Sequence, residues 1–254
     1  MNKIKKKLNA FVEEGNQIVC VTCYDASFSK ILADQKIDIV LVGDSLGMVI
    51  QGENNTHKVK MDDILYHVSC VSKNKTNFIL MSDMPKNSYE DCKSAYSNAK
   101  KLLDSNVDIV KIEYQKEYDE IINDLVLKSV PVCAHIGLLP QYISKNEDIR
   151  IYGKDKSEGE TILQQANHLE KMGVDLILLE CVDFELSKNI TNSVKIPVIG
   201  IGSGEYCDGQ VQVLYDLIGI SNNPPKFAKD YLINGKNIEG AIKDFHNYVK
   251  SIKN

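Results

Sequence analysis

Short runs of apolar residues recur along the whole chain and are separated by amphipathic stretches. Continuous apolar runs of this length are typical of parallel strands buried on both faces, and the stretches between them have the periodicity of helices that bury one side. The runs that predict strands are Val19–Asp25, Ile37–Asp44, Phe78–Asp83, Val107–Glu113, Val130–His135, Val174–Cys181, Ile196–Ile201 and Val211–Asp216. The stretches that predict helices are 26–35, 61–73, 88–104, 117–128, 158–172, 183–193 and, after Pro224-Pro225, about 237–252.

Strands that alternate with helices in this way predict an α/β protein, namely a (β/α)₈ TIM barrel. We expect one domain over residues 1–254, with an N-terminal and a C-terminal helix added to the barrel. The weakest connection is Gly202–Gln210, which leaves room only for a turn between the last two strands. A doubly wound open sheet is the alternative architecture.

Three of the predicted strands share a pattern, because each opens with an apolar residue followed by Asp and closes with an acid. They lie about two βα units apart, so they would be alternate strands of a barrel, whose side chains fall in the same layers. Their closing acids could therefore converge at one mouth. The opening aspartates, which we expect to be surface residues at the other end, are Asp38, Asp108 and Asp175.

Composition narrows the class of protein. Asp and Glu number 35 against 30 Lys and Arg in 254 residues, a net charge of −5, which argues against a nucleic-acid-binding surface. No apolar run approaches the roughly 18 residues that a membrane span needs. The basic N-terminus lacks the apolar core of a secretion signal, so it is expected to be a surface helix. The seven scattered cysteines indicate thiols in a reducing cytoplasm rather than a disulfide framework.

Candidate chemistry gathers where the predicted strands end. Active sites of TIM barrels lie at the carboxyl ends of the strands. The residues there are Tyr24, Asp25, Asp44, Ser45, Asp83, Lys111, Glu113, His135, Glu180 and Gly202-Ser203. Several carboxylates around one mouth repel one another and need a cation, and oxygen ligands of this kind suit Mg²⁺.

Three of these side chains have specific expectations. Lys111 and Glu113 are two apart on one strand, so they point to the same side. Nearby carboxylates would keep Lys111 an ammonium, suited to an anionic substrate rather than to Schiff-base chemistry, although a structural Lys–Glu ladder would look the same. Glu180 follows an apolar run, so desolvation could raise its pKa into the range of a general base; a helix cap or salt bridge is the alternative.

Several motifs, in order along the chain, resemble those of the ketopantoate hydroxymethyltransferases (3-methyl-2-oxobutanoate hydroxymethyltransferases). They run from about residue 20 to residue 230. The matching segments are Val42-Gly43-Asp44-Ser45-Leu46-Gly47-Met48, Ser82-Asp83-Met84-Pro85, Val110-Lys111-Ile112-Glu113, His135-Ile136-Gly137-Leu138, Pro140-Gln141, Leu179-Glu180-Cys181-Val182, Pro197-Val198-Ile199-Gly200-Ile201-Gly202 and Pro225-Lys226-Phe227-Ala228-Lys229. The family fold is a (β/α)₈ barrel, as the strand count also predicts.

The resemblance implies a reaction and a site. The hydroxymethyl group of 5,10-methylenetetrahydrofolate would pass to 3-methyl-2-oxobutanoate through a magnesium-stabilised enolate, giving 2-dehydropantoate for pantothenate synthesis. It implies Mg²⁺ on Asp44, Asp83 and Glu113, and substrate binding by Asp44, Ser45, Asp83 and Lys111. Glu180 would be the catalytic base that removes the C3 proton. Family members form homo-oligomers, often decamers.

Some positions depart from the family pattern. Lys86 stands where the family usually has Phe, and Tyr114-Gln115 replaces Gly-Gly. The loop 144–157 is also altered, and we expect these departures to affect the binding of folate more than the removal of the C3 proton. Two other functions stay open, an aldolase or lyase that acts on another 2-oxo acid, and a barrel without catalytic activity. The second should have lost an acid at Asp44, Asp83 or Glu180, and all three are present.

Overall fold

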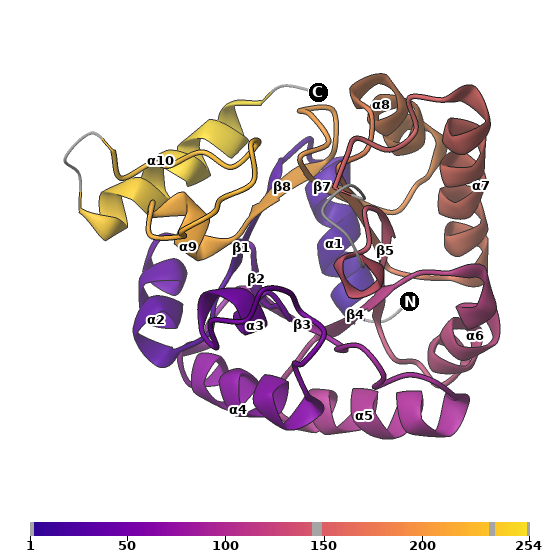
Figure 1. Ribbon diagram of the computed structural model, residues 1–254, viewed down its shortest axis with the longest axis horizontal. Coiled ribbons are helices and arrows are strands. Elements are labelled where there is room, and N and C mark those ends of the chain that lie inside the picture. Colours follow the sequence, from indigo (N-terminus) through magenta and orange to yellow (C-terminus); the bar gives the residue numbers. More distant parts are fainter. Residues whose placement is uncertain (1–2, 144–148, 234–236, 253–254) are drawn as a thin grey trace.

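The computed structural model describes residues 3–143, 149–233 and 237–252. In these residues, parallel strands pair in sequence order and β8 pairs with β1, so the sheet closes into a barrel (Figure 1). The prediction of a TIM barrel is confirmed, and the alternative architecture, a doubly wound open sheet, is wrong. The strands are β1 Ile18–Thr22, β2 Ile39–Val42, β3 Ile79–Asp83, β4 Ile109–Glu113, β5 Val132–Gly137, β6 Leu176–Glu180, β7 Val198–Ile201 and β8 Gly209–Gln212.

Helices surround the barrel (Figure 1). Their bounds are α1 Lys3–Glu13, α2 Ala26–Asp34, α3 Leu46–Val49, α4 Met61–Val71, α5 Cys92–Asp104, α6 Asp119–Leu127, α7 Lys156–Met172, α8 Phe184–Ser193, α9 Leu214–Leu217 and α10 Ile238–Ser251, with 3₁₀ turns η1 Ser72–Asn74, η2 Lys116–Tyr118 and η3 Pro140–Tyr142. None of the described helices is long and apolar enough to cross a membrane.

The predicted last strand, Val211–Asp216, is wrong in its second half. The strand ends at Gln212 and helix α9 follows immediately. The Leu214 backbone N–H donates to Thr22 Oγ1 (3.0 Å), so a residue at the end of β1 terminates the strand pairing of β8. The short α3, which was not predicted, turns the chain directly after β2.

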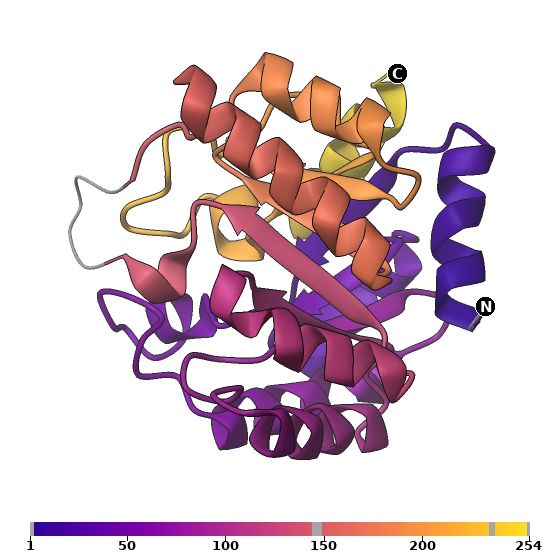
Figure 2. The same cartoon turned by 90° about the vertical axis from the view of Figure 1, so that its right-hand side faces the viewer.

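Alternate strand residues divide the apolar core in two. One cluster fills the barrel interior and includes Cys20, Leu41, Met81 and Leu178, while a larger one lies between the strands and the outer helices. Leu8 of α1 is fully buried in the interior cluster, so α1 closes the amino-terminal end of the barrel. Figure 2 shows α1 in indigo at one end and the arrow of β5 pointing toward the loops at the other. The basic N-terminal stretch is thus a helix, as predicted, but one whose apolar side is buried.

The expectation that the opening aspartates are merely surface residues is wrong. Each one accepts a hydrogen bond from the preceding strand. The bonds join Asp38 Oδ2 to the Val19 N–H (2.9 Å), Asp108 Oδ2 to the Leu80 N–H (2.9 Å) and Asp175 Oδ2 to the Val132 N–H (3.1 Å). Asp208, just before β8, does the same for Val198 of β7 (2.9 Å). Four aspartates therefore satisfy backbone donors at the bottom of the barrel and help to set the register of its strands.

Candidate active site

Polar side chains replace apolar ones in the barrel interior toward the carboxyl ends of the strands. Strand alternation places Asp83 above Met81, and Lys111 and Glu113 above Ile109, on the inward side. Glu180 lies two residues beyond Leu178, which faces inward, so Glu180 faces inward as well. Lys111 and Glu113 both point into the barrel, which confirms the prediction that they lie on the same side of their strand.

Two carboxylates and one ammonium form the centre of the cluster. The Asp44 backbone N–H donates to Asp83 Oδ2 (2.9 Å), and Lys111 Nζ lies 2.8 Å from Asp83 Oδ1. Burial raises the pKa of Asp44, and the neighbouring charge of Asp83 raises it further. Burial alone would lower the pKa of Lys111, but the surrounding carboxylates outweigh it and hold that pKa above its ordinary value. Lys111 is therefore an ammonium, as expected.

Glu113 borders this centre. Its pKa is raised by burial and by the charge of Asp44, while Lys111 acts in the opposite direction. Glu113 Oε2 accepts the backbone N–H of Gln141 (3.0 Å). Asp44, Asp83, Lys111 and Glu113 are each at most 6% exposed, so the structure brings together four of the predicted site residues in a desolvated cluster.

Glu180 lies on the opposite side of His135 from Lys111. His135 Nε2 is 3.2 Å from Glu180 Oε2, and His135 Nδ1 is 3.5 Å from Lys111 Nζ. Burial and Lys111 lower the pKa of His135, so its ring is neutral. Burial raises the pKa of Glu180 to about 7, although its side chain keeps 17% exposure. A carboxylate with that pKa and an open side can exchange protons near neutral pH.

Ser45 lies at the edge of the cluster beside a residue that sequence reasoning assigned no role. Its Oγ is 2.8 Å from the Tyr24 hydroxyl, which itself donates to Thr22 Oγ1 (3.0 Å). Tyr24 can therefore accept a hydrogen bond from Ser45 and fix the orientation of the serine hydroxyl. The sequence signal was the position of Tyr24 at the end of the first strand.

Gln141 is the second residue that sequence reasoning missed. It is 1% exposed, its Nε2 donates to Asp44 Oδ2 (2.8 Å) and its Oε1 accepts from the Tyr89 hydroxyl (2.6 Å). Together with its backbone bond to Glu113, these contacts tie the loop after β5 to two acids of the cluster. Gln141 appears in one of the family-like motifs, but only the fold shows what it touches.

Other strand-end residues have structural partners. Asp25 caps α2 by accepting the Phe28 N–H (2.9 Å). Ser203 Oγ accepts from the Val182 N–H (3.1 Å) and donates to the Leu179 carbonyl (3.0 Å), so it ties strand ends together. Part of the altered loop, residues 144–148, lies outside the described residues.

The donor chemistry fits a magnesium ion on two of the three proposed ligands. Among the described residues, no three His, Cys, Asp or Glu side chains are already arranged around a metal position. Mg²⁺, however, typically takes one or two carboxylates and completes its octahedron with waters or substrate oxygens. Asp44 and Asp83 are adjacent, and the negative charge of Asp83 raises the pKa of Asp44. A divalent cation bound between them would relieve this repulsion.

The fold and this acid–base cluster define a TIM-barrel enzyme with its site at the carboxyl ends of the strands. Solved structures with this fold include a phosphonopyruvate hydrolase complex with oxalate and Mg²⁺ (TM-score 0.64, 9% identity, 84% of this chain and 81% of that one) and a 2,3-dimethylmalate lyase (TM-score 0.62, 13%, 83% and 80%). At such identities the likeness concerns the fold alone.

Sequence comparison identifies the family. The model of the ketopantoate hydroxymethyltransferases matches residues 3–253. The 3-methyl-2-oxobutanoate hydroxymethyltransferase of Photorhabdus laumondii is 41% identical over 244 residues, which cover 96% of this chain and 93% of that protein. The protein of the same name from Buchnera aphidicola is 42% identical over 239 residues, 93% and 91% of the two chains. The chain belongs to the ketopantoate hydroxymethyltransferase family, as its motifs predicted.

Proposed function

We propose that this protein transfers a hydroxymethyl group to 3-methyl-2-oxobutanoate in pantothenate biosynthesis, with 5,10-methylenetetrahydrofolate as the one-carbon donor. Membership of the family supports the reaction, and the cluster at the barrel mouth supports the assignment of roles. In this reaction the C3–H bond of the oxo acid breaks and a C3–CH₂ bond to the one-carbon unit forms. The bonds from that unit to the folate nitrogens break, water supplies the hydroxyl group, and the products are 2-dehydropantoate and tetrahydrofolate.

Glu180 is the base in this proposal, and its environment is the observation that carries it. Burial raises its pKa to about 7, which balances basicity against availability of the carboxylate near neutral pH. Neutral His135 lies beside the Glu180 carboxyl group, with its Nε2 3.2 Å from Glu180 Oε2. Glu180 accepts the C3 proton, and the electron pair left behind is delocalised onto the 2-oxo oxygen.

Asp44 and Asp83 would hold Mg²⁺, with Glu113 in reach directly or through a water. When bound there, the ion supplies Lewis-acid stabilisation of negative charge on substrate oxygen. The Lys111 ammonium, 2.8 Å from Asp83, provides the positive charge that a carboxylate substrate needs beside these acids. Ser45, whose hydroxyl group is held by Tyr24, would position the same substrate group.

Further parts of the proposal extend the family resemblance. We expect a single domain over residues 1–254 that assembles as a homo-oligomer, with a decamer expected from the family. Light scattering of the purified protein tests the assembly, and a monomeric mass would contradict it. We place the enzyme in the cytoplasm, which agrees with the seven cysteines, all free in the described structure.

Hydrogen exchange at C3 tests the base without the folate. The protein is incubated with 3-methyl-2-oxobutanoate and Mg²⁺ in D₂O, and the C3 proton is followed by NMR. We expect exchange with the wild type and a loss of about 10²-fold or more with Glu180→Gln, the scale of general-base catalysis. Exchange by Glu180→Gln at the wild-type rate would exclude Glu180 as the base, and the absence of exchange in folded wild type would count against the substrate.

A further inference from the structure

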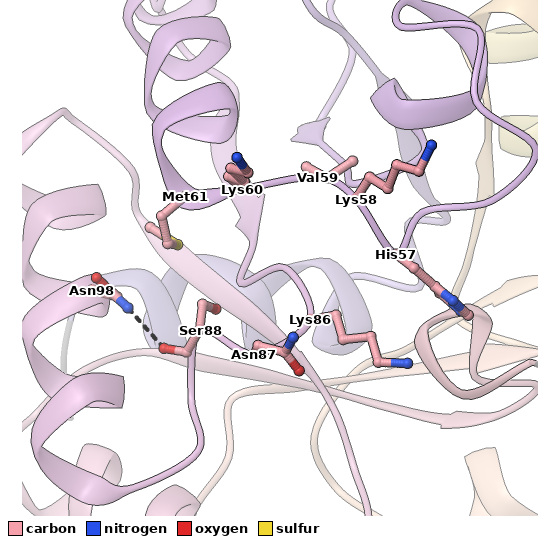
Figure 3. Close-up of a pocket in the computed structure, with 9 residues that line it drawn as sticks. All are labelled: His57, Lys58, Val59, Lys60, Met61, Lys86, Asn87, Ser88 and Asn98. Atoms are coloured by element: carbon pink, nitrogen blue, oxygen red, sulfur yellow. Dashed lines mark hydrogen bonds between the residues drawn. The ribbon is translucent and has the colours of Figure 1, made fainter.

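A cavity of about 490 Å³ lies between two loops on the rim of the barrel. One wall is formed by the segment before α4, which includes His57 and Lys60, and the other by the segment after β3, which includes Lys86 and Ser88. Figure 3 shows the two segments on opposite sides of the space. The volume is within the range of small-ligand pockets, about 300–1,000 Å³.

The charge of the cavity lining is positive, because no Asp or Glu belongs to it. Lys58, which points away from Lys86 in Figure 3, pairs with Glu53 (2.8 Å). Lys60 and Lys86 make no ion pair with a carboxylate of the described residues; Lys86 Nζ lies 5.7 Å from the centre of the Tyr142 ring. Two ammonium groups thus remain available to an anion.

A buried donor points to a ligand independently of these charges. Ser88 is 5% exposed, yet its hydroxyl has no hydrogen-bond partner among the described residues. Its backbone carbonyl is fixed by Asn98 Nδ2 (2.8 Å), and the preceding Asn87 has a left-handed φ of 65°. A constrained turn therefore holds an unsatisfied hydroxyl in a cationic cavity, where an anionic oxygen would satisfy it.

The cavity adjoins the candidate active site through both of its walls. Lys86 follows the proposed magnesium ligand Asp83 by three residues. His57 Nε2 lies 3.2 Å from the carbonyl of Pro140, and the next residue, Gln141, donates to Asp44. A ligand that reacts at the barrel mouth and carries an anionic extension could reach the cavity by crossing the rim.

We propose that this cavity binds the carboxylates of the glutamyl tail of the folate co-substrate, with Lys60, Lys86 and the Ser88 hydroxyl as the binding groups. This inference rests on the proposed function, because it requires 5,10-methylenetetrahydrofolate at the barrel mouth. A single glutamyl tail ends in two carboxylates, and each further γ-linked glutamate adds one and extends the tail. A longer tail therefore brings more carboxylates within reach of the two ammonium groups and the Ser88 hydroxyl.

The test compares KM for monoglutamyl and triglutamyl 5,10-methylenetetrahydrofolate in the hydroxymethyl transfer reaction. Because exposed ion pairs are individually weak, we expect the wild type to favour the triglutamyl form by about fivefold in KM. The Lys60→Met/Lys86→Met variant should reduce this preference to less than about twofold, with kcat retained. Ser88→Ala should reduce it in part. Lys243→Met, an exposed site on α10 with the same type of charge change, should keep the preference.

Several results would overturn the inference. Equal KM values for the two co-substrates in the wild type would do so, as would an equal loss of preference in Lys243→Met. Inorganic phosphate should compete with the triglutamyl form in the wild type; phosphate that binds without affecting this preference would indicate a site for free anions instead. C3 exchange in D₂O needs no folate, so exchange without tail preference contradicts only this inference, whereas absence of exchange and transfer contradicts the proposed function.

Discussion

Lys111 is the buried cation of the active-site cluster, and its replacement by Met should destabilise the protein strongly. The Lys111 and Asp83 side chains are 6% and 3% exposed, with Nζ and Oδ1 2.8 Å apart. At an effective dielectric constant of about 20, two unit charges at that distance attract by about 6 kcal/mol. The variant also avoids the cost of burying the ammonium. We therefore expect its free energy of unfolding to fall by about 3–5 kcal/mol, as for other broken buried pairs.

The loss should depend on pH in a definite direction. Without Lys111, the carboxyl groups of Asp44, Asp83 and Glu113 face one another with no ammonium, so the raised pKa values of Asp44 and Glu113 rise further. A carboxyl group whose folded-state pKa exceeds its unfolded value contributes stability at low pH that is lost as the pH rises through the folded-state pKa. In the wild type the pKa of Asp44 is already about 8, so the two proteins lose stability in parallel below that pH and diverge above it. The difference between variant and wild type should therefore be larger at pH 9 than at pH 7.

Urea denaturation of both proteins at the two pH values, without added metal, measures these differences. Lys243→Met should change the free energy of unfolding by less than about 0.5 kcal/mol, because its side chain is on the surface. Adding Asp83→Asn to Lys111→Met should recover part of the loss, since one of the unpaired charges is removed. A loss below about 1 kcal/mol at pH 9, or no dependence on pH, would refute the role of Lys111 as the compensating cation.

Three further predictions concern the base, the metal and the strand packing. The rate of C3 exchange should rise about tenfold per pH unit below pH 7 and level off above it, because Glu180 must be ionised to accept the proton; a flat profile would contradict this. EDTA should abolish exchange and added Mg²⁺ restore it, as NMR in D₂O can show; exchange that survives thorough chelation would argue against the metal. Gly209→Ala should lower the free energy of unfolding, measured with urea, by more than about 2 kcal/mol, because the new Cβ would lie 2.4 Å from the Ile18 carbonyl oxygen. Gly15→Ala has open space around the new Cβ and should cost only the backbone strain of a positive φ, about 1 kcal/mol. Equal losses in the two variants would contradict the steric argument.

The parts of the site that follow from local periodicity could be predicted from the sequence. Alternation along one strand is enough to place Lys111 and Glu113 on the same side, and a position after an apolar run is enough to expect a raised pKa at Glu180. The TIM barrel also followed from the number and order of the apolar runs.

Features that depend on contacts between distant segments could not be predicted in the same way. Gln141 reaches Asp44 across 97 residues, and Leu214 ends the last strand by a bond to Thr22, 192 residues away. Neither contact leaves a local pattern in the chain. Asp38 was assigned to the correct end of the barrel, but its bond to the Val19 N–H requires the register between two strands, which apolar periodicity alone does not specify.

The strand register connects the bottom of the barrel to the chemistry at its top. β2, β4 and β6 are each preceded by an aspartate that binds the backbone of the strand before, and each is closed or followed by an acid: Asp44, Glu113 and Glu180. Because a strand is a stiff element of fixed rise per residue, fixing its lower end also fixes the height of the acid at its upper end. β8 has the lower anchor, Asp208, but runs directly into α9 without an acid. The four bottom aspartates therefore serve the whole barrel, whereas the clustered acids Asp44, Asp83, Glu113 and Glu180 come from β2, β3, β4 and β6, where the substrate is proposed to bind.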